Sequence, residues 1–257
     1  MNCVIIYIIA GFLFKCSFPH LSMGLTLIGT GVSFDLTLAG FEALKSCDNA
    51  YIETYTNPID QNRIQNLEQK LGKKIELLSR EQLESSYLVN IAKSKDICLL
   101  VSGDPLTATT HITLLIDAKE MGVGVHVIHN SSIYSTAPAR CGLQIYRFGK
   151  TASLVNPRPN YKPTSSLEII RENLKRDLHS LVLLDTEPKP MEAKNALEML
   201  SEFDSAIVLS CVASDEEKII FGKINEIKNK SLGKAPFTII IPAKLHPVEE
   251  DYLLLKK

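Results

Sequence analysis

The feature that most constrains this chain is an apolar run that stops at a Gly-Asp-Pro turn. Residues 97–101 are apolar at every position, and after one serine the chain continues with Gly103-Asp104-Pro105. A strand that is apolar on both faces fits the middle of a parallel sheet covered by helices on both sides. In open sheets of this kind, ligands bind beyond the carboxyl ends of the strands. We therefore expect the loop after residue 101 to belong to a binding site.

Short apolar runs alternate with amphipathic segments along most of the chain, which is typical of α/β folds. The sequence predicts two α/β domains with mostly parallel or mixed sheets, over residues 24–155 and 165–257. A proline-rich stretch, 156–164, reads as the linker between them. The helix after the Gly-Asp-Pro turn is predicted to run from about residue 108 to residue 121.

The first 23 residues fall outside this alternation. Residues 4–14 are apolar, but the run is too short to span a bilayer comfortably. No Lys or Arg precedes it, as a secretory signal would require. Because Met23 stands immediately before the first predicted strand, we expect residues 1–23 to lie outside the fold, as an extension or a misassigned start.

Composition narrows the possible partners. The net charge of −1 offers no broad basic surface for nucleic acid, and the absence of Trp argues against a base-stacking platform. The six cysteines form no C-x-x-C pair, which is typical of a reduced protein without a structural zinc. We expect a cytoplasmic protein that binds neither nucleic acid, metal nor membrane.

One motif imitates a dinucleotide site, and the chain carries no obvious nucleophile. Gly29-x-Gly31 follows a predicted strand and Glu53 follows about twenty residues later, but Phe34 replaces the third glycine and Asp35 would repel a pyrophosphate.

No Gly-x-Ser-x-Gly elbow is present, and the histidines lack metal-ligand spacing. Loops that are rich in small polar residues and poor in reactive groups suit methyl transfer from S-adenosylmethionine, whose sulfonium is itself the electrophile. We assign no catalytic residue.

Several motifs then resemble a known family in order and register. They are Leu27-Ile28-Gly29-x-Gly31, Tyr51-x-Glu53-x-Tyr55-Thr56, Gly103-Asp104-Pro105-x-x-Ala108-Thr109-Thr110-His111, His129-Asn130-x-Ser132-Ile133, Cys141-Gly142-Leu143-Gln144, His179-Ser180-Leu181 and Lys244-Leu245-His246-Pro247-Val248-Glu249. From about residue 24 to the C-terminus the chain resembles the diphthine synthases, the methyltransferases of diphthamide biosynthesis in the tetrapyrrole-methylase-like superfamily.

The resemblance implies a homodimer with S-adenosylmethionine in the cleft between two α/β domains. It also implies a protein substrate, translation elongation factor 2, whose histidine carries a 3-amino-3-carboxypropyl group that is methylated repeatedly. Carried over by position, the cofactor contacts would be Val32, Asp104, Thr107, Ser132, Ile133, Leu184, Val212 and Thr238.

Departures from the family pattern leave two alternatives. Val32-Ser33-Phe34 lacks the acidic residue that usually follows the second glycine, and Thr238 stands where the family has histidine. The chain could be a catalytically weakened cofactor-binding relative, or a methylase of the same superfamily that acts on a corrin or porphyrin precursor. The Ala108-Thr109-Thr110-His111 extension favours the diphthamide branch.

Overall fold

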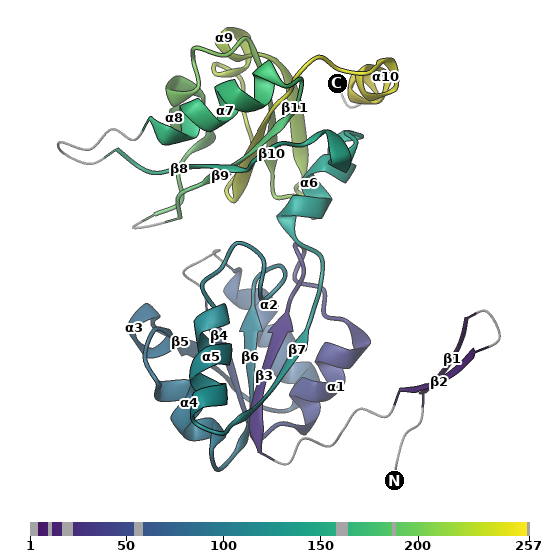
Figure 1. Cartoon of the computed structure of the whole chain (residues 1–257), viewed down its shortest axis with the longest axis vertical. Helices are drawn as coiled ribbons and strands as arrows, with labels where there is room; N and C mark the ends of the chain where they lie inside the picture. The colour runs from purple at the N-terminus through teal and green to yellow at the C-terminus, as the bar shows by residue number, and fades with distance from the viewer. Residues whose placement is uncertain are drawn as a thin grey trace.

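Two five-stranded sheets with flanking helices form the molecule (Figure 1). The computed structural model describes residues 23–53, 59–157, 164–186 and 189–255, together with the backbone of 5–9 and 12–16. The predicted α/β class with parallel and mixed sheets is confirmed.

The first sheet is parallel throughout, in the order β5-β4-β6-β3-β7. Its strands are β3 (Gly24–Gly29), β4 (Asn49–Glu53), β5 (Ile75–Leu78), β6 (Asp96–Val101) and β7 (Gly124–Ile128). β6 is the central strand, and its residues 97–101 are at most 1% exposed. This confirms the expectation of a strand that is covered on both faces.

Helices on the two faces of this sheet form two separate apolar clusters. Leu99 of β6 packs with residues of α4 and α5, whereas its neighbour Leu100 packs with residues of α1 and α2. This division follows from the alternation of side chains along a strand. The helices of this part of the chain are α1 (Leu38–Ser46), α2 (Gln61–Leu71), α3 (Arg80–Leu83), α4 (Tyr87–Ala92) and α5 (Ile112–Glu120).

The second sheet is mixed, in the order β11-β10-β12-β9-β8, and only β8 and β9 are parallel neighbours. Its strands are β8 (Ala152–Leu154), β9 (Ser180–Leu184), β10 (Ser205–Ser210), β11 (Lys218–Lys223) and β12 (Phe237–Ile241). The accompanying helices are α6 (Ile133–Cys141), the 3-10 turn η1 (Ile145–Arg147), α7 (Ser165–Lys175), α8 (Ala193–Met199), α9 (Ile224–Ile227) and α10 (Pro247–Leu254).

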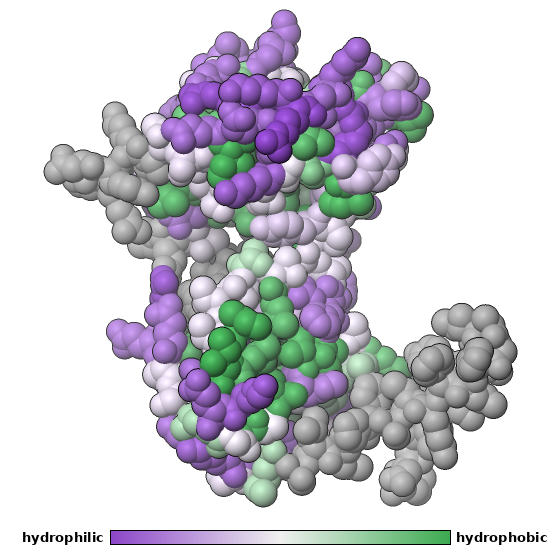
Figure 2. All heavy atoms as spheres, in the orientation of Figure 1, coloured by the Kyte–Doolittle hydropathy of each residue, from purple (hydrophilic) through white to green (hydrophobic). Residues whose placement is uncertain are grey.

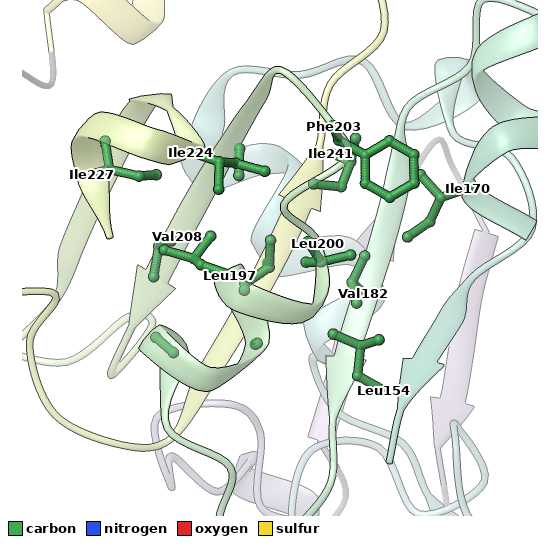
Figure 3. Close-up of a cluster of buried hydrophobic side chains, with 14 of the residues drawn as sticks. Leu154, Ile170, Val182, Leu197, Leu200, Phe203, Val208, Ile224, Ile227 and Ile241 are labelled. Carbon is green, nitrogen blue, oxygen red and sulfur yellow. The ribbon is translucent and has the colours of Figure 1, made fainter. Parts of the chain in front are cut away.

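Apolar clusters also cover both faces of the second sheet. Figure 3 shows the cluster on one face, where Val182 of β9 and Ile241 of β12 meet Ile170 of α7 and Leu197 of α8. On the other face, Ala137 and Cys141 of α6 pack with Ile207 of β10 and Leu253 of α10. Each sheet is therefore a layer between two apolar clusters.

The chain enters the second sheet earlier than residue 155, where we placed the end of the first domain. β8 pairs with β9, and α6 packs on the second sheet through Ala137 and Cys141. The chain therefore crosses from the first sheet to the second directly after β7, because the apolar side of α6 packs against the second sheet. The predicted linker at 156–164 lies mostly outside the described residues, and the domain limits stay a prediction.

The N-terminal strands β1 (Ile5–Ile9) and β2 (Phe12–Cys16) pair with each other in an antiparallel hairpin. In the described backbone this hairpin belongs to neither five-stranded sheet (Figure 1). The hypothesis that translation starts at Met23 concerns residues that lie largely outside the described part of the chain, and it stays a prediction.

A buried carboxylate joins three of the sequence motifs in the second half of the molecule. Glu249 is fully buried and accepts hydrogen bonds from the Gln144 N–H at 3.1 Å, Arg147 Nη1 at 2.7 Å and His179 Nε2 at 3.4 Å. Burial raises the pKa of Glu249, but these bonds and one from the His246 N–H outweigh it and hold the pKa below its ordinary value. Several residues that resemble the family motifs thus stabilise the fold.

Gly142 at the end of α6 is required both by its backbone conformation and by the close approach of a neighbouring side chain. Gly72 shares the conformation but not the contact, so it separates the two effects. Gly142 has φ +70, and a Cβ there would lie 2.4 Å from a ring carbon of Tyr252, whereas Gly72 has φ +67 and open space. We expect Gly72→Ala to cost about 1 kcal/mol of unfolding free energy through backbone strain alone. Gly142→Ala adds overpacking and should cost roughly 2–4 kcal/mol in total. Urea denaturation measures both, and equal losses would contradict the assigned contact.

Candidate functional site

Three loops meet at the carboxyl edge of the first sheet, after β3, β6 and β7. Gly31 and Gly103 exchange backbone hydrogen bonds of 3.0 and 3.2 Å, which joins the first two loops directly. A Cβ at Gly29 would lie 2.6 Å from the Gly103 carbonyl oxygen and 2.9 Å from Cβ of Asn130 in the third loop. The loops therefore pack backbone against backbone, and glycine permits this approach.

Asp104 holds the second loop to the third. One carboxylate oxygen accepts from the Leu106 N–H and the Thr107 hydroxyl, both at 3.0 Å. The other accepts from His129 Nδ1 at 2.8 Å and the Asn130 N–H at 3.3 Å. Burial raises the pKa of Asp104, but the four hydrogen bonds outweigh it and keep the pKa below its ordinary value. Because these donors occupy the carboxylate, its role is to fix the loops.

Asn130 joins the third loop to the first, and the sequence reasoning did not place it among the site residues. Its side-chain nitrogen donates to the carbonyls of Gly29 at 2.9 Å and Asp35 at 2.8 Å. Its neighbour Ser131 accepts from the Val32 N–H at 3.2 Å through its hydroxyl. One sequence signal could have pointed to Asn130: it stands two residues after a strand, where asparagine side chains commonly form hydrogen bonds to backbone groups.

The Thr-Thr-His extension folds back on the turn instead of starting the helix. The Thr109 hydroxyl and His111 Nδ1 both donate to the Pro105 carbonyl, at 3.1 and 3.2 Å. The helix begins at Ile112, so our prediction of about residue 108 was wrong by a turn. Burial lowers the pKa of His111, and the nearby Glu53 offsets this only in part, so the imidazole is neutral near pH 7.

Backbone strain occurs in two of these loops and in the turn after β10. Non-glycine residues with positive φ include Phe34 after β3, Ala108 after β6, and Cys211 and Ala213 in the turn after β10. Such conformations cost free energy and persist where the surrounding structure imposes them, which is frequent at ligand sites. Two of these residues, Phe34 and Ala108, lie in loops that also carry sequence motifs.

The structure brings most of the expected cofactor contacts together. Thr107 is bonded to Asp104, and Ser132 is the N-terminal cap of α6 with Ile133 following it. Val32 and Ile133 both pack against the apolar cluster that contains Val212.

The side chains of the two remaining expected contacts are engaged within the second sheet. Leu184 packs on the opposite face of the second sheet, with the α7 and α8 cluster. Thr238 alternates with Phe237 and Ile239, which face that cluster, so its side chain lies on the same face as Val212. Its hydroxyl donates to the Val182 carbonyl at 3.0 Å. The Thr238 hydroxyl, which stands where the family has an imidazole, is therefore engaged in a hydrogen bond within the second sheet.

A cavity of about 740 Å³ with a mixed polar and apolar lining adjoins these loops. It is lined by residues 33–38 and Phe41, by four residues of α2, and by residues 213–215. The first of these segments directly follows Val32 in the chain, and residues 213–215 directly follow Val212.

No helix in the described ranges is long and apolar enough to cross a membrane. The same ranges contain no cluster of three or more His, Cys, Asp or Glu side chains that could hold a metal ion.

Comparison with known proteins agrees with this architecture. Residues 24–228 match the family described as Tetrapyrrole (Corrin/Porphyrin) Methylases. The chain therefore belongs to the tetrapyrrole methylases.

Several similar proteins within that class are named diphthine synthase. The chain is 40% identical to a diphthine synthase of Methanocaldococcus jannaschii and 39% identical to that of Staphylothermus marinus; the matches cover 89% of this chain in each case, and 97% and 92% of those proteins. A crystal structure of diphthine synthase superposes with a TM-score of 0.83 at 31% identity, covering 90% of this chain and 95% of that one. A putative diphthine synthase from Entamoeba histolytica gives 0.82 at 32% identity, covering 92% and 99%. The chain is thus a member of the diphthine synthase branch.

Asp104 provides a test of the loop arrangement. Asp104→Ala leaves the Leu106 and Asn130 N–H groups without their acceptor, and we expect the loss of about 2 kcal/mol of unfolding free energy. Affinity for S-adenosylhomocysteine should fall at least about tenfold, with the far-ultraviolet circular dichroism unchanged. Calorimetric titration measures the affinity, and unchanged binding would contradict the role of Asp104.

The lowered pKa of Asp104 adds a pH dependence. A carboxyl whose folded pKa is depressed stabilises the protein above its unfolded pKa of about 3.9, and this contribution is lost as the pH falls through the folded pKa. The stability difference between wild type and Asp104→Asn should therefore be constant from pH 7 to about 5 and shrink below about 4. A difference that does not depend on pH would contradict the assignment.

Proposed function

We propose that this chain is an S-adenosylmethionine-dependent methyltransferase of diphthamide biosynthesis. Its substrate would be the modified histidine of translation elongation factor 2, and its product the repeatedly methylated 3-amino-3-carboxypropyl group. The observation that carries the proposal is the junction of three loops by Asp104 and Asn130, in a chain that matches proteins named diphthine synthase over nearly their full length.

The residues at the junction suit the proposed methyl donor. Val32, Ile133 and Val212 would form an apolar wall for its adenine and for the methylene groups beside its sulfonium. Ser132 makes no side-chain cap to α6, so the first N–H groups of this helix could receive the donor's carboxylate. Asp104 would act indirectly, by holding Thr107 and the Leu106 backbone in place. Leu184 and Thr238 would contribute main-chain contacts, because their side chains are engaged within the second sheet.

The chemistry that this site must supply is alignment. When bound, S-adenosylmethionine provides a methyl group on a positively charged sulfonium. The protein holds donor and acceptor in line and excludes water, and such positioning supplies a large share of the rate in displacement reactions. Neutral His111 stabilises the donor loop through Pro105 and takes no part in proton transfer in this account.

We further propose a cytoplasmic homodimer. Ile112 and Ile116 of α5 are 53% and 52% exposed, and Figure 2 shows apolar side chains gathered over this part of the first sheet's helical layer. A second copy of the chain would cover this surface. Light scattering should give twice the 28.5 kDa of one chain, and a monomer mass would contradict the dimer.

Transfer of a labelled methyl group tests the proposed function. The full chain is incubated with methyl-labelled S-adenosylmethionine and elongation factor 2 that carries the unmethylated 3-amino-3-carboxypropyl histidine. We expect the modified peptide to gain methyl groups, and a factor with unmodified histidine to gain none. A corrin precursor serves as the competing acceptor. Methylation of the corrin precursor alone, or cofactor binding without any transfer, would overturn the proposal.

A further inference from the structure

The cavity beside the three loops is lined by charged side chains of both signs. Its lining includes Arg63 and Lys70 of α2, Asp35 of the loop after β3, and Asp215 of the turn after β10. All four residues are exposed. Two cations and two carboxylates therefore line one cavity of about 740 Å³.

Some neighbouring charges on the described surface are paired within the protein. Glu68, also on α2, pairs with Lys74 at 2.9 Å, and Lys234 pairs with Glu216 at 2.7 Å beside the turn after β10. Within the described ranges, none of the four cavity charges forms an ion pair with another protein group. Arg63 donates one hydrogen bond to the Ser33 carbonyl, which fixes the guanidinium at the cavity wall.

The cavity also offers a favourable field for a carboxylate. Thr37 caps α1 by accepting from the Gly40 N–H at 3.0 Å, and the first turn of α1 contains no acidic residue. The positive end of the helix dipole therefore adds to the charges of Arg63 and Lys70. Phe34, whose φ is +59, and Phe41 supply apolar surface beside the polar groups.

We infer that this cavity binds the amino-acid end of the acceptor, a neighbouring carboxylate and amine on an aliphatic stem. Arg63 and Lys70 receive the carboxylate, and Asp35 and Asp215 face the amine. A phosphate would favour a surplus of cations, whereas equal numbers of both signs match a zwitterion. This inference rests on the proposed function and adds the place of acceptor recognition.

The position of the cavity supports this assignment. Ser33 and Ala213 line it, and each directly follows a residue of the proposed donor wall, Val32 or Val212. An acceptor held by its carboxylate in the cavity therefore has its amine close to the donor site. None of the eight expected cofactor contacts lines the cavity, so donor and acceptor have separate binding groups.

Acceptor KM and donor affinity, measured separately, test the inference. The acceptor is elongation factor 2 carrying the unmethylated precursor, and the donor affinity is measured by calorimetry with S-adenosylhomocysteine. We expect Arg63→Ala to raise the acceptor KM at least about tenfold, because a hydrogen bond to a charged group is lost. Lys70→Ala should raise it about threefold, and Arg63→Lys should recover part of the loss. Donor affinity should change less than about twofold in all three.

Lys93→Ala is the matched control, since Lys93 is an exposed cation at the end of α4 and does not line the cavity. Its KM should equal that of wild type. An unchanged acceptor KM in both Arg63→Ala and Lys70→Ala, with wild type active, would overturn the inference and leave the proposed function intact. A fall in donor affinity with unchanged acceptor KM would also overturn it, by assigning the cavity to the donor. An inactive wild type overturns both.

Discussion

The junction of three loops at one edge of a parallel sheet is the constraint on which the rest of this structure depends. Gly31 and Gly103 bring two loops into backbone contact, and Asp104 and Asn130 fasten the third by hydrogen bonds of 2.8–3.3 Å. β3 and β6 beneath them are almost entirely buried, so the loops are the first places where polar groups can gather. The second sheet completes this region from the other side, through Val212 against Val32 and Ile133.

A second network of hydrogen bonds joins several segments in the other half of the molecule. Glu249 brings α10, η1 and β9 together by accepting from Gln144, Arg147 and His179. A buried carboxylate of this kind is costly unless every oxygen is bonded, so each partner is needed for the same reason. Residues that resemble a family's motifs can thus be required by folding, and a match at Cys141–Gln144 or His246–Glu249 identifies relatives without marking the site.

The sequence predicted the sheet architecture well because burial dictates it: an apolar run such as 97–101 has few alternatives to a central strand. The start of α5 was predicted a turn too early, because Thr109 and His111 bond to Pro105, a contact that helical periodicity does not reveal. Asp104 lies in the loop that the sequence singled out, but its hydrogen bond to His129 depends on the strand order β6-β3-β7, which the sequence does not reveal. The charged cavity could not be foreseen, since Arg63 and Asp215 are distant in the chain and meet only in the fold.

We propose that the joined loops bind the methyl donor while the charged cavity is left for the acceptor. A crystal structure of the full chain with S-adenosylhomocysteine tests it most directly. The account predicts that the bound molecule contacts Val32, Thr107 and Ile133, with Asp104 still bonded to His129 and the Arg63 side chain free of ligand. A molecule seated against Arg63 and Lys70, away from Thr107 and Ile133, would contradict it.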